Sequence, residues 1–509
     1  MSPQNPSRPY DVLVVGAGPT GLMAGLVAHR RGLRTLVIDA KDGPTRESRA
    51  LVVQARSLEI LDQLGLSGPV LAADALATGI QIGDAASPVR LDITSLQEGW
   101  TPFPGVHIFE QSRTEHLLST ALEEEGCPVR YGHELRSFLV GAPDAPDGVE
   151  AIVDGPTGPQ RIRARWLIGA DGASSPVRHQ LGLAFEGVTD DATFCVADLR
   201  GVEGVPESAL SARFGERRFA VLFPMGSDGH ARLIWLHGAA HPTAQEALAG
   251  AQEDLGITFA HLDWFSSYRV HHRVAERFRV GPVLLAGDAA HVHSPVGGQG
   301  MNTGLQDAHG LAHLLADIAA GHLAPRAIEH FEAERRPVAL TLIRATDSAF
   351  GVIARTGPVH AFARRRLRDL AGALAPRLLA SSQGPRIAGW LGQYRIRYRP
   401  VAKGVPLPRW ARDRIVGVRL APTPHNAEHL RAMGWRLLVH GARAERPPAV
   451  PDWIEGPFTL PADPTGSARP DRLLLVRPDG FVAAAWPLHA GASADADVRE
   501  ALAALGVVG

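Results

Sequence analysis

The stretch YDVLVVGAGPTGL at residues 10–22 decides the fold of this chain. Its apolar run ends in three glycines with the spacing G-x-G-x-x-G, and a second apolar run, LVIDA, follows at 36–40. This order predicts a buried parallel strand at 11–15, a tight turn, a helix at 20–31 and a second strand at 35–39. The sequence therefore predicts a βαβ unit, the building block of a doubly wound α/β fold.

Each glycine of the turn has its own use in binding a dinucleotide. Gly16 permits the tight turn, Gly18 lets the backbone approach a pyrophosphate, and Gly21 lets the helix pack close to the strand. The helix N-terminus offers free N–H groups to phosphate oxygens. Asp39 lies 18 residues after Gly21, at a strand end, where its carboxylate can accept hydrogen bonds from ribose hydroxyls. This motif predicts a dinucleotide site but does not distinguish NAD from FAD.

A second motif, VLLAGDAAHVHSPVGGQGMNTGLQDA at 283–308, makes that distinction. A strand delivers Gly287 and Asp288 at its carboxyl end, where an acid can hold a sugar-alcohol chain. A glycine-rich turn then leads into a helix at about 301–319, whose free N–H groups can point at a ring that becomes anionic on reduction. FAD has a ribityl chain and an isoalloxazine ring, and NAD has neither. The second motif therefore predicts FAD as the resident cofactor.

Size and composition limit the class of protein. The chain has 509 residues, enough for two or three domains, with 45% hydrophobic and 21% charged residues. A formal net charge of −1 gives no electrostatic case for nucleic acid or an anionic membrane. The polar N-terminus lacks the apolar core of a signal peptide, and no apolar run is long enough to span a bilayer. Cys127 and Cys195 fit a reduced cytoplasm and exclude a disulfide framework.

The pattern of short strands indicates a second sheet within the chain. Stretches such as ATFCVADLRG at 192–201 and HARLIWLHG at 230–238 carry β-branched and aromatic alternation. They predict an antiparallel sheet inserted into the nucleotide-binding domain. The expected domains are FAD-binding at 1–180, with part of the substrate domain near 80–105, then a substrate-binding β-sheet at 181–272, the FAD-binding domain continued with helices at 273–385, and a C-terminal domain at 386–509.

The chain resembles the class A FAD-dependent aromatic hydroxylases, the para-hydroxybenzoate and phenol hydroxylase superfamily. Three motifs carry the resemblance: GAGPTG at 16–21, GADG at 169–172 and GDAAH…GGQGMNTG at 287–304. It implies an enzyme in which NADPH or NADH reduces bound FAD and O2 adds to form a flavin hydroperoxide. The distal oxygen of that species then attacks an electron-rich aromatic ring of a phenolic, polyketide or drug-like substrate.

The resemblance also implies roles for individual residues. Arg49 falls where the family places an arginine near the flavin, Gln111 falls where a flavin-contacting glutamine lies, and Asp171 belongs to a motif that serves both FAD and NAD(P)H. Arg49 and Pro295 are the catalytic candidates. The implied FAD-binding residues are Gly16, Ala17, Gly18, Pro19, Thr20, Gly21, Asp39, Ala40, Arg49, Gln111, Asp171, Gly287, Asp288, Pro295, Gly298, Gln299, Gly300, Met301 and Asn302.

The C-terminal part resembles a subgroup of that family. YRIRY at 394–398 and LLLVRPDGFVAAAW at 473–486 look like the thioredoxin-like tail of phenol, phenylpropionate and polyketide hydroxylases. No cysteine follows Cys195, so this domain cannot run dithiol chemistry. The resemblance implies a structural role or a role in homodimer contacts. In DAHGLAHLLA, where the family often reads DAxNLAWKLA, His313 stands in place of the usual tryptophan, so we expect altered helix packing.

The substrate region offers weaker signals. Arg213, Phe223 and Trp235 are candidate substrate contacts, although an arginine flanking a strand is more often solvated and a tryptophan more often belongs to the core. Tyr268, His237 and His271 are further candidates, and both histidines have surface positions as their simpler interpretation. His291 and His293 form H-x-H without a third ligand at suitable spacing, so we expect no metal site. The sequence names no catalytic base.

Two alternatives remain open from the sequence alone. The same flavin scaffold supports Baeyer–Villiger oxygen insertion, or a dehydrogenase or oxidase, because function depends on the pocket rather than the fold. A non-enzymatic protein with a structural flavin is the other alternative. The intact GGQGMN stretch argues against it, since a purely structural cofactor would not need a poised ring environment.

Overall fold

The fold comes from a computed structural model of the chain. The structure describes residues 8–45, 50–73, 76–82, 89–142, 145–215, 218–294, 297–354, 377, 381, 383–399, 406–441, 448–488 and 493–508.

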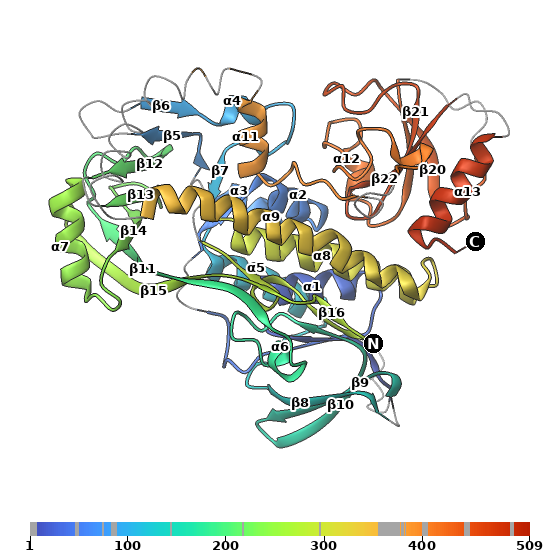
Figure 1. Ribbon diagram of the computed structural model, residues 1–509, viewed down its shortest axis with the longest axis horizontal. Coiled ribbons are helices and arrows are strands. Elements are labelled where there is room, and N and C mark those ends of the chain that lie inside the picture. Colours follow the sequence, from blue (N-terminus) through green and yellow to red (C-terminus); the bar gives the residue numbers. More distant parts are fainter. Residues whose placement is uncertain are drawn as a thin grey trace.

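A seven-stranded sheet carries the first glycine motif (Figure 1). Its main path runs in the order β16-β17-β10-β1-β2, and β1 pairs in parallel with both β2 and β10. The meander β8-β9-β10 extends it with antiparallel pairs. The strands are β1 (Tyr10–Val15), β2 (Thr35–Ile38), β8 (Glu134–Ala142), β9 (Ala145–Gly155), β10 (Gly158–Gly169), β16 (Arg279–Val280) and β17 (Val283–Leu285).

Helices pack on this sheet as the βαβ pattern predicts. α1 connects β1 to β2 and lies beside α8 and α5 (Figure 1). Gly25 of α1 makes this close packing possible, because a Cβ there would lie 2.5 Å from the Val37 side chain of β2. Apart from α7 and the helices of the C-terminal part, the described α-helices are α1 (Pro19–Arg30), α2 (Ala55–Gln63), α3 (Gly68–Leu71), α4 (Thr94–Gln97), α5 (Gln111–Glu124), α6 (Pro176–Gln180), α8 (Gly300–Ala319), α9 (Glu329–Ala354) and α11 (Gly384–Leu391).

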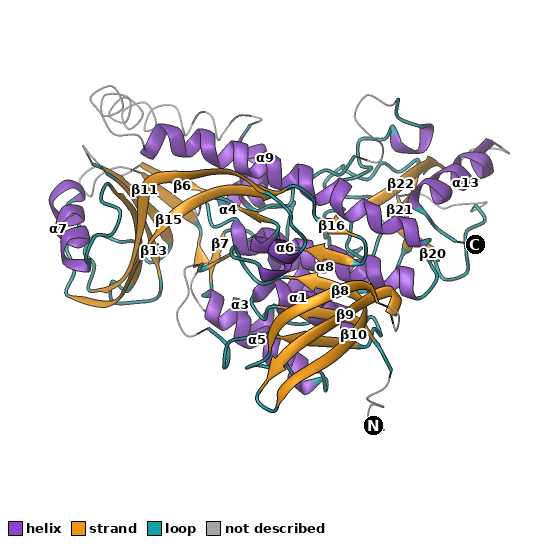
Figure 2. Cartoon of the chain, turned by 60° about the horizontal axis from the view of Figure 1, so that its bottom comes forward, coloured by secondary structure: helices purple, strands orange, loops and turns teal. Residues whose placement is uncertain are grey.

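An eight-stranded sheet, in the order β18-β15-β11-β14-β13-β12-β5-β6, forms the second layer. Its long strands β11 and β15 extend from this layer towards the seven-stranded sheet (Figure 2). Its strands are β5 (Gly79–Ile82), β6 (Val89–Asp92), β11 (Phe185–Arg200), β12 (Ala209–Phe214), β13 (Phe219–Pro224), β14 (Ala231–His237), β15 (His261–Ala275) and β18 (His291–Val292). β5 and β12 pair in parallel, so the expectation of a purely antiparallel sheet was wrong at that pair.

One face of the eight-stranded sheet is covered by α7 (Ala244–Leu255). Thr243 begins this helix with a capping box, in which its hydroxyl and the Glu246 carboxylate each bond the other's backbone N–H. Ala247, Leu248 and Ala251 of α7 form a separate hydrophobic core with Leu222 and other strand residues. The opposite face of the sheet is therefore the one available to a ligand. The small sheet β3 (Val52–Val53), β7 (Val106–Ile108) and β4 (Leu76–Ala77) joins the two layers.

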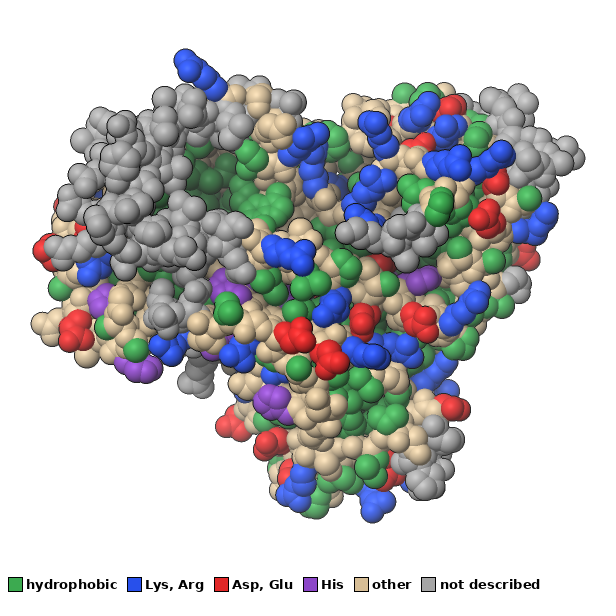
Figure 3. Space-filling model, in the orientation of Figure 1, with side chains coloured by type: hydrophobic (Ala, Val, Ile, Leu, Met, Phe, Trp, Pro, Cys, Tyr) green, Lys and Arg blue, Asp and Glu red, His purple; other side chains and the backbone are tan. Residues whose placement is uncertain are grey.

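The C-terminal part forms a four-stranded sheet in the order β20-β19-β21-β22. β19 and β20 pair in parallel, and the other neighbours pair antiparallel. Its elements are α12 (Ala427–Arg431), β19 (Arg436–His440), β20 (Glu455–Leu460), β21 (Arg472–Val476), β22 (Val482–Pro487) and α13 (Ser493–Leu505). Lys and Arg side chains are frequent on the visible face of this part, interspersed with acidic ones (Figure 3). Among the described residues, no helix combines the length and apolar character needed to cross a membrane.

Buried histidines on α8 lie next to the contact between the N-terminal and C-terminal parts of the chain. His313 Nδ1 accepts from Arg31 at 2.9 Å, and His309 Nε2 lies 2.6 Å from Gln63 Oε1. Gln63 in turn donates to the carbonyls of Leu430 and Pro478, both at 2.8 Å. Gln63 thus makes the hydrogen bonds that reach the C-terminal part, and His309 of the unusual DAHGLAHLLA stretch lies against the other end of its amide.

We expect this protein to lose stability steeply on acidification because several of its histidines are buried and uncharged. Burial lowers the pKa of His309 to about 3, and of His107 and His293 to about 4. Between pH 6.5 and these values the unfolded chain binds protons that the folded chain does not. Each such histidine therefore lowers the free energy of unfolding by about 1.4 kcal/mol for each pH unit by which the pH falls in that window.

Urea denaturation between pH 7.5 and 5 measures this slope. His309→Gln should reduce it by about 1.4 kcal/mol per pH unit, because glutamine can still reach Gln63 but does not titrate. His241→Asn, at an exposed position, is the control. An identical slope in His309→Gln and the control would show that His309 is protonated in the folded protein.

Candidate active site

A cavity of about 540 Å³ lies where the two glycine motifs meet the open face of the eight-stranded sheet. Many residues predicted from the sequence line it, and their contacts with FAD stay predictions. They are Gly18, Pro19, Thr20, Gln111, Phe223, Asp288, Gly298, Gln299, Gly300 and Met301.

The first motif has the geometry that a pyrophosphate site needs. Gly16 has φ +104°, which favours glycine, and a Cβ on Gly21 would lie 1.8 Å from the Gly16 carbonyl oxygen. Gly18 has ordinary dihedral angles and no atom within 4 Å of its Cβ position. The first two features shape the turn, whereas the space beside Gly18 is open for a ligand. α1 begins directly after it, so free N–H groups face the same region.

The acid at the end of β2 is bonded to this turn. Asp39 Oδ2 accepts from the Ala17 N–H at 2.6 Å, and Oδ1 accepts from the Lys41 N–H at 2.8 Å. A carboxylate can accept further bonds on the same oxygens, so ribose hydroxyls can still be bound. Ala40 follows it at an exposed position. Gln111 opens α5 and donates to Glu115 Oε1 at 2.9 Å, which positions its amide at the cavity.

The start of α8 forms the opposite wall. The first intrahelical bond runs from Thr303 N–H to Gln299 O, so the N–H groups of Gly300, Met301 and Asn302 have no partner within the helix. The buried Asn302 side chain fixes this turn: Nδ2 donates to Val52 O at 2.8 Å and to Gly298 O at 2.7 Å. The three N–H groups are thus held at the cavity, where negative charge on a reduced flavin ring would be stabilised.

A buried charge cluster supports the Gly287-Asp288 turn from behind. Asp307 Oδ2 accepts from the Gly287 N–H at 3.1 Å and lies 2.8 Å from His291 Nε2, while Oδ1 accepts from Arg335 Nε at 2.6 Å. Burial alone would raise the pKa of Asp307, but Arg335 and His291 outweigh it and lower that pKa to about 2. Asp307 is therefore ionised and holds the turn that directs Asp288 to the cavity. The sequence reasoning did not identify Asp307 as a functional residue.

The eight-stranded sheet supplies an apolar end to the cavity. Phe223, Ile234 and Tyr268 lie here, from β13, β14 and β15. Two predicted substrate residues do not. Arg213, Ala220 and Trp235 occupy one cross-strand row, so their side chains share a face of the sheet. That face is covered by α7, and Trp235 packs in the hydrophobic core between α7 and the sheet. Arg213 instead donates to the Gly204 carbonyl at 3.2 Å.

His293 lies beside the start of α8 and lines the cavity. Its Nδ1 donates to the Ser294 carbonyl at 2.8 Å, which leaves the lone pair on Nε2. Nε2 is buried without a partner among the described residues. Because the pKa of His293 is about 4, the ring is neutral at physiological pH. From the sequence, His293 was considered only as half of an H-x-H pair. Its position in the loop between Asp288 and the glycines is the sequence signal that indicates a residue of the cavity.

Other predicted residues have different surroundings. Asp171 caps its own loop, accepting from Ser175 Oγ at 2.5 Å and from the Val177 N–H at 2.9 Å, and it does not line the cavity. His237 accepts from the Ala239 N–H, and His271 lies at an exposed position, which fits their surface interpretation. Arg49 and Pro295, the catalytic candidates, lie outside the described residues.

Comparison with known proteins identifies the family. Residues 9–346 match the family model described as FAD binding domain. The chain is 32% identical over 494 residues to the 12-dehydrotetracycline 5-monooxygenase/anhydrotetracycline 6-monooxygenase of Streptomyces rimosus subsp. rimosus, covering 93% of this chain and 94% of that protein. The chain belongs to the FAD-dependent aromatic hydroxylase family. This confirms the family, the monooxygenase class and the FAD cofactor predicted from the sequence.

Solved structures of the family share the full-length architecture of this FAD-dependent monooxygenase. The anhydrotetracycline hydroxylase from Streptomyces rimosus superposes with a TM-score of 0.78 at 30% identity, over 98% of this chain and 99% of that chain. An aromatic hydroxylase from angucycline biosynthesis superposes with a TM-score of 0.75 at 30% identity and the same coverage. The mixed α/β fold predicted from the sequence is thereby confirmed.

The residues of this chain fit FAD. The open space at Gly18, the carboxylates of Asp39 and Asp288, and the N–H groups at the start of α8 supply what a pyrophosphate, two sugar chains and a flavin ring require. Gly18 would adjoin the pyrophosphate, Asp39 would hold the ribose, and Asp288 would hold the ribityl chain. Gly300 and Met301 would face the ring.

Proposed function

We propose that this enzyme hydroxylates a ring carbon of a polycyclic phenolic substrate of the polyketide type, with NADPH or NADH and O2 as co-substrates. The observation that carries the proposal is the apolar end of the cavity, formed by Phe223, Ile234 and Tyr268 next to the start of α8. The similarity along nearly the whole chain to a 12-dehydrotetracycline and anhydrotetracycline monooxygenase supports the same substrate class.

The protein's own part in the reaction is to bind, orient and exclude water. Bound in the cavity, FAD supplies the redox chemistry, namely hydride acceptance from NAD(P)H and activation of O2. The N–H groups of Gly300 and Met301 stabilise negative charge at this end of the cavity. The apolar side chains of the sheet hold the aromatic ring flat and keep water from the reacting carbon. The neutral ring of His293 adds no positive charge there.

Turnover by the FAD-loaded protein tests the proposal. NADPH and NADH oxidation is followed with and without single-ring phenols and polycyclic phenols, and products are weighed by mass spectrometry. We expect polycyclic phenols to stimulate oxidation most and to gain one oxygen atom on a ring carbon. A lactone product would establish the Baeyer–Villiger alternative. Oxidation that no aromatic compound changes would indicate an oxidase, and a protein that binds FAD but never oxidises NAD(P)H would contradict the monooxygenase assignment.

We expect Phe223→Leu to raise KM for the aromatic substrate about three- to tenfold, because it removes part of an apolar wall without leaving a large void. Trp235→Phe is the matched control, since it changes an aromatic side chain on the α7 face of the same sheet. Steady-state kinetics of both variants measure the difference. An equal effect of the two substitutions on KM would mean that the substrate does not use this face.

We also propose a thioredoxin-like C-terminal domain, supported by its four-stranded mixed sheet and by the helix α13 against β22. Cys127 and Cys195 are buried free thiols outside this domain, which supports a structural rather than a redox role for it and fits a cytoplasmic location. The predicted homodimer remains a proposal, and analytical ultracentrifugation of the holoenzyme tests it.

A further inference from the structure

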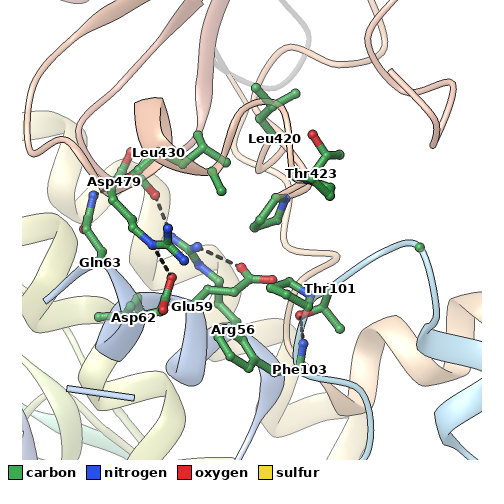
Figure 4. A pocket seen from close by; sticks show the side chains of 18 of the residues that line it. Arg56, Glu59, Asp62, Gln63, Thr101, Phe103, Leu420, Thr423, Leu430 and Asp479 are labelled. Atoms are coloured by element: carbon green, nitrogen blue, oxygen red, sulfur yellow. Dashed lines mark hydrogen bonds and ion pairs between the residues drawn. The ribbon is translucent and has the colours of Figure 1, made fainter. Parts of the chain in front are cut away.

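A second cavity, of about 480 Å³, lies between the FAD-binding part and the C-terminal part. α2 and the loop at 99–103 form one side, and the segments 420–431 and 479–480 form the other (Figure 4). It shares no lining residue with the cavity at the glycine motifs. Its volume falls within the range of roughly 300–1,000 Å³ that small-molecule sites have.

The charges of this cavity are already paired with one another. Arg56 forms an ion pair with Glu59 at 3.0 Å and donates to the Asp479 carbonyl at 2.6 Å. Asp62 pairs with Arg431 at 2.7 Å. A strongly charged ligand would have to break one of these pairs or be buried beside them unpaired, which is costly. The cavity therefore favours a neutral ligand.

Three buried polar atoms of the lining have no hydrogen-bond partner among the described residues: Nε of Arg56, Oγ1 of Thr423 and Oε1 of Glu59. Glu59 Oε1 lies 3.4 Å from Arg419 Nη1 in an ion pair. The two donors, Arg56 Nε and Thr423 Oγ1, belong to residues that are 7% and 6% exposed, and they are the atoms left for a ligand. A buried donor without an acceptor costs about 1–3 kcal/mol, so a ligand oxygen that reached either atom would gain that energy. Both groups donate hydrogen bonds, and a carbonyl or hydroxyl oxygen is the complementary group.

The remaining wall is apolar. Phe103, Leu420 and Leu430 lie around the polar groups (Figure 4). Ile60 and prolines of both parts of the chain also line the cavity. Such a wall with a few fixed polar groups is typical of sites for aromatic small molecules. We infer that this interdomain cavity is a second ligand site, which binds a neutral, oxygenated aromatic molecule.

The site is tested with FAD-loaded protein and 1,4-dihydroxyanthraquinone, a flat neutral aromatic that carries carbonyl and hydroxyl oxygens. Equilibrium dialysis counts the equivalents bound per chain. Ala427→Trp fills the cavity from α12, and Glu428→Trp places the same indole on the exposed side of that helix as the matched control. We expect Ala427→Trp to bind one equivalent fewer than the wild type, and Glu428→Trp to bind the wild-type number.

Equal numbers of equivalents in Ala427→Trp and Glu428→Trp would overturn the inference, as would a wild-type chain that binds no probe. Retained FAD and cooperative thermal unfolding show that the variants are folded. If Ala427→Trp fails that check, Thr423→Val decides, because it removes the unpartnered hydroxyl at constant shape. It should weaken one class of sites about three- to tenfold, and unchanged affinity would overturn the inference. Neither result depends on turnover, so the proposed hydroxylation can fail separately.

Discussion

Gly18→Val is expected to leave the fold intact and to weaken FAD binding about 100-fold or more, equivalent to ~2.7 kcal/mol. The backbone at Gly18 has φ −77° and ψ 179°, an extended conformation that valine adopts readily, and no protein atom lies within 4 Å of its Cβ position. The added side chain therefore meets no protein. It occupies the space through which a pyrophosphate approaches the N–H groups at the start of α1.

FAD titration by fluorescence and thermal unfolding of the apoprotein separate binding from folding. Gly68→Val is the matched control, because Gly68 is also free of neighbours within 4 Å but opens α3 away from the cavity. Gly21→Val is the opposite case, since its Cβ would lie 1.8 Å from the Gly16 carbonyl oxygen and should destabilise the apoprotein itself. Wild-type FAD affinity in Gly18→Val would place the pyrophosphate elsewhere.

These glycine positions could be predicted from the sequence because the signal is local. A turn, a strand and a helix within thirty residues require small residues at set positions, and the spacing at 16–21 and 297–300 displays them. The same holds for the acids, since Asp39 directly follows the buried strand β2 and Asp288 comes three residues after the buried strand β17. The family resemblance rested on these motifs, and the comparisons confirm it.

The direction of side chains in the second sheet could not be predicted in this way. The strand ARLIWLH at 231–237 carries apolar side chains on both of its faces, so Ile234 and Trp235 are equally plausible as ligand contacts. The decision depends on α7, which covers the face of Trp235 and Arg213. The parallel pairing of β5 with β12 could not be predicted from the sequence either. The two strands are separated by more than a hundred residues, and no local pattern encodes their register.

Asp171 has a local role that the motif did not reveal. Its contacts with FAD and NAD(P)H stay a prediction, and within the chain its oxygens accept from Ser175 Oγ and the Val177 N–H. A carboxylate three to six residues ahead of a hydroxyl and a helix start can serve as a local cap. The following residues SSPV carry the signal for such a cap.

Asp307→Asn is expected to lower the unfolding free energy by about 3–5 kcal/mol, because it leaves Arg335 buried without its counter-charge. Arg335 is 3% exposed, and its remaining partners are the Tyr398 hydroxyl at 3.0 Å and the Thr303 carbonyl at 3.3 Å. Both are neutral. The amide also cannot accept from Gly287, His291 and Arg335 together, since one of its two terminal atoms is a donor.

The loss should extend to the cofactor, because Asp307 holds the Gly287 N–H and so the turn that presents Asp288. We expect FAD affinity to fall in the folded variant, measured by FAD content after dialysis, while urea denaturation of the apoprotein measures stability. Asp263→Asn is the control: it removes a carboxylate at 2.6 Å from Arg200 in a partly exposed pair, for which about 0–1 kcal/mol is expected.

The pH dependence of the same carboxylate has a defined sign. The folded pKa of Asp307 is about 2, below the value near 3.9 of an unfolded aspartate, so its stabilisation is complete above pH 4 and declines from there towards pH 2. The histidine effect acts between pH 6.5 and about 3, so the two groups overlap only below pH 4.

An Asp307→Asn variant that loses no more stability than Asp263→Asn at pH 7 would show that water or a rearranged Tyr398 compensates Arg335. The cluster would then support the flavin turn through shape rather than charge.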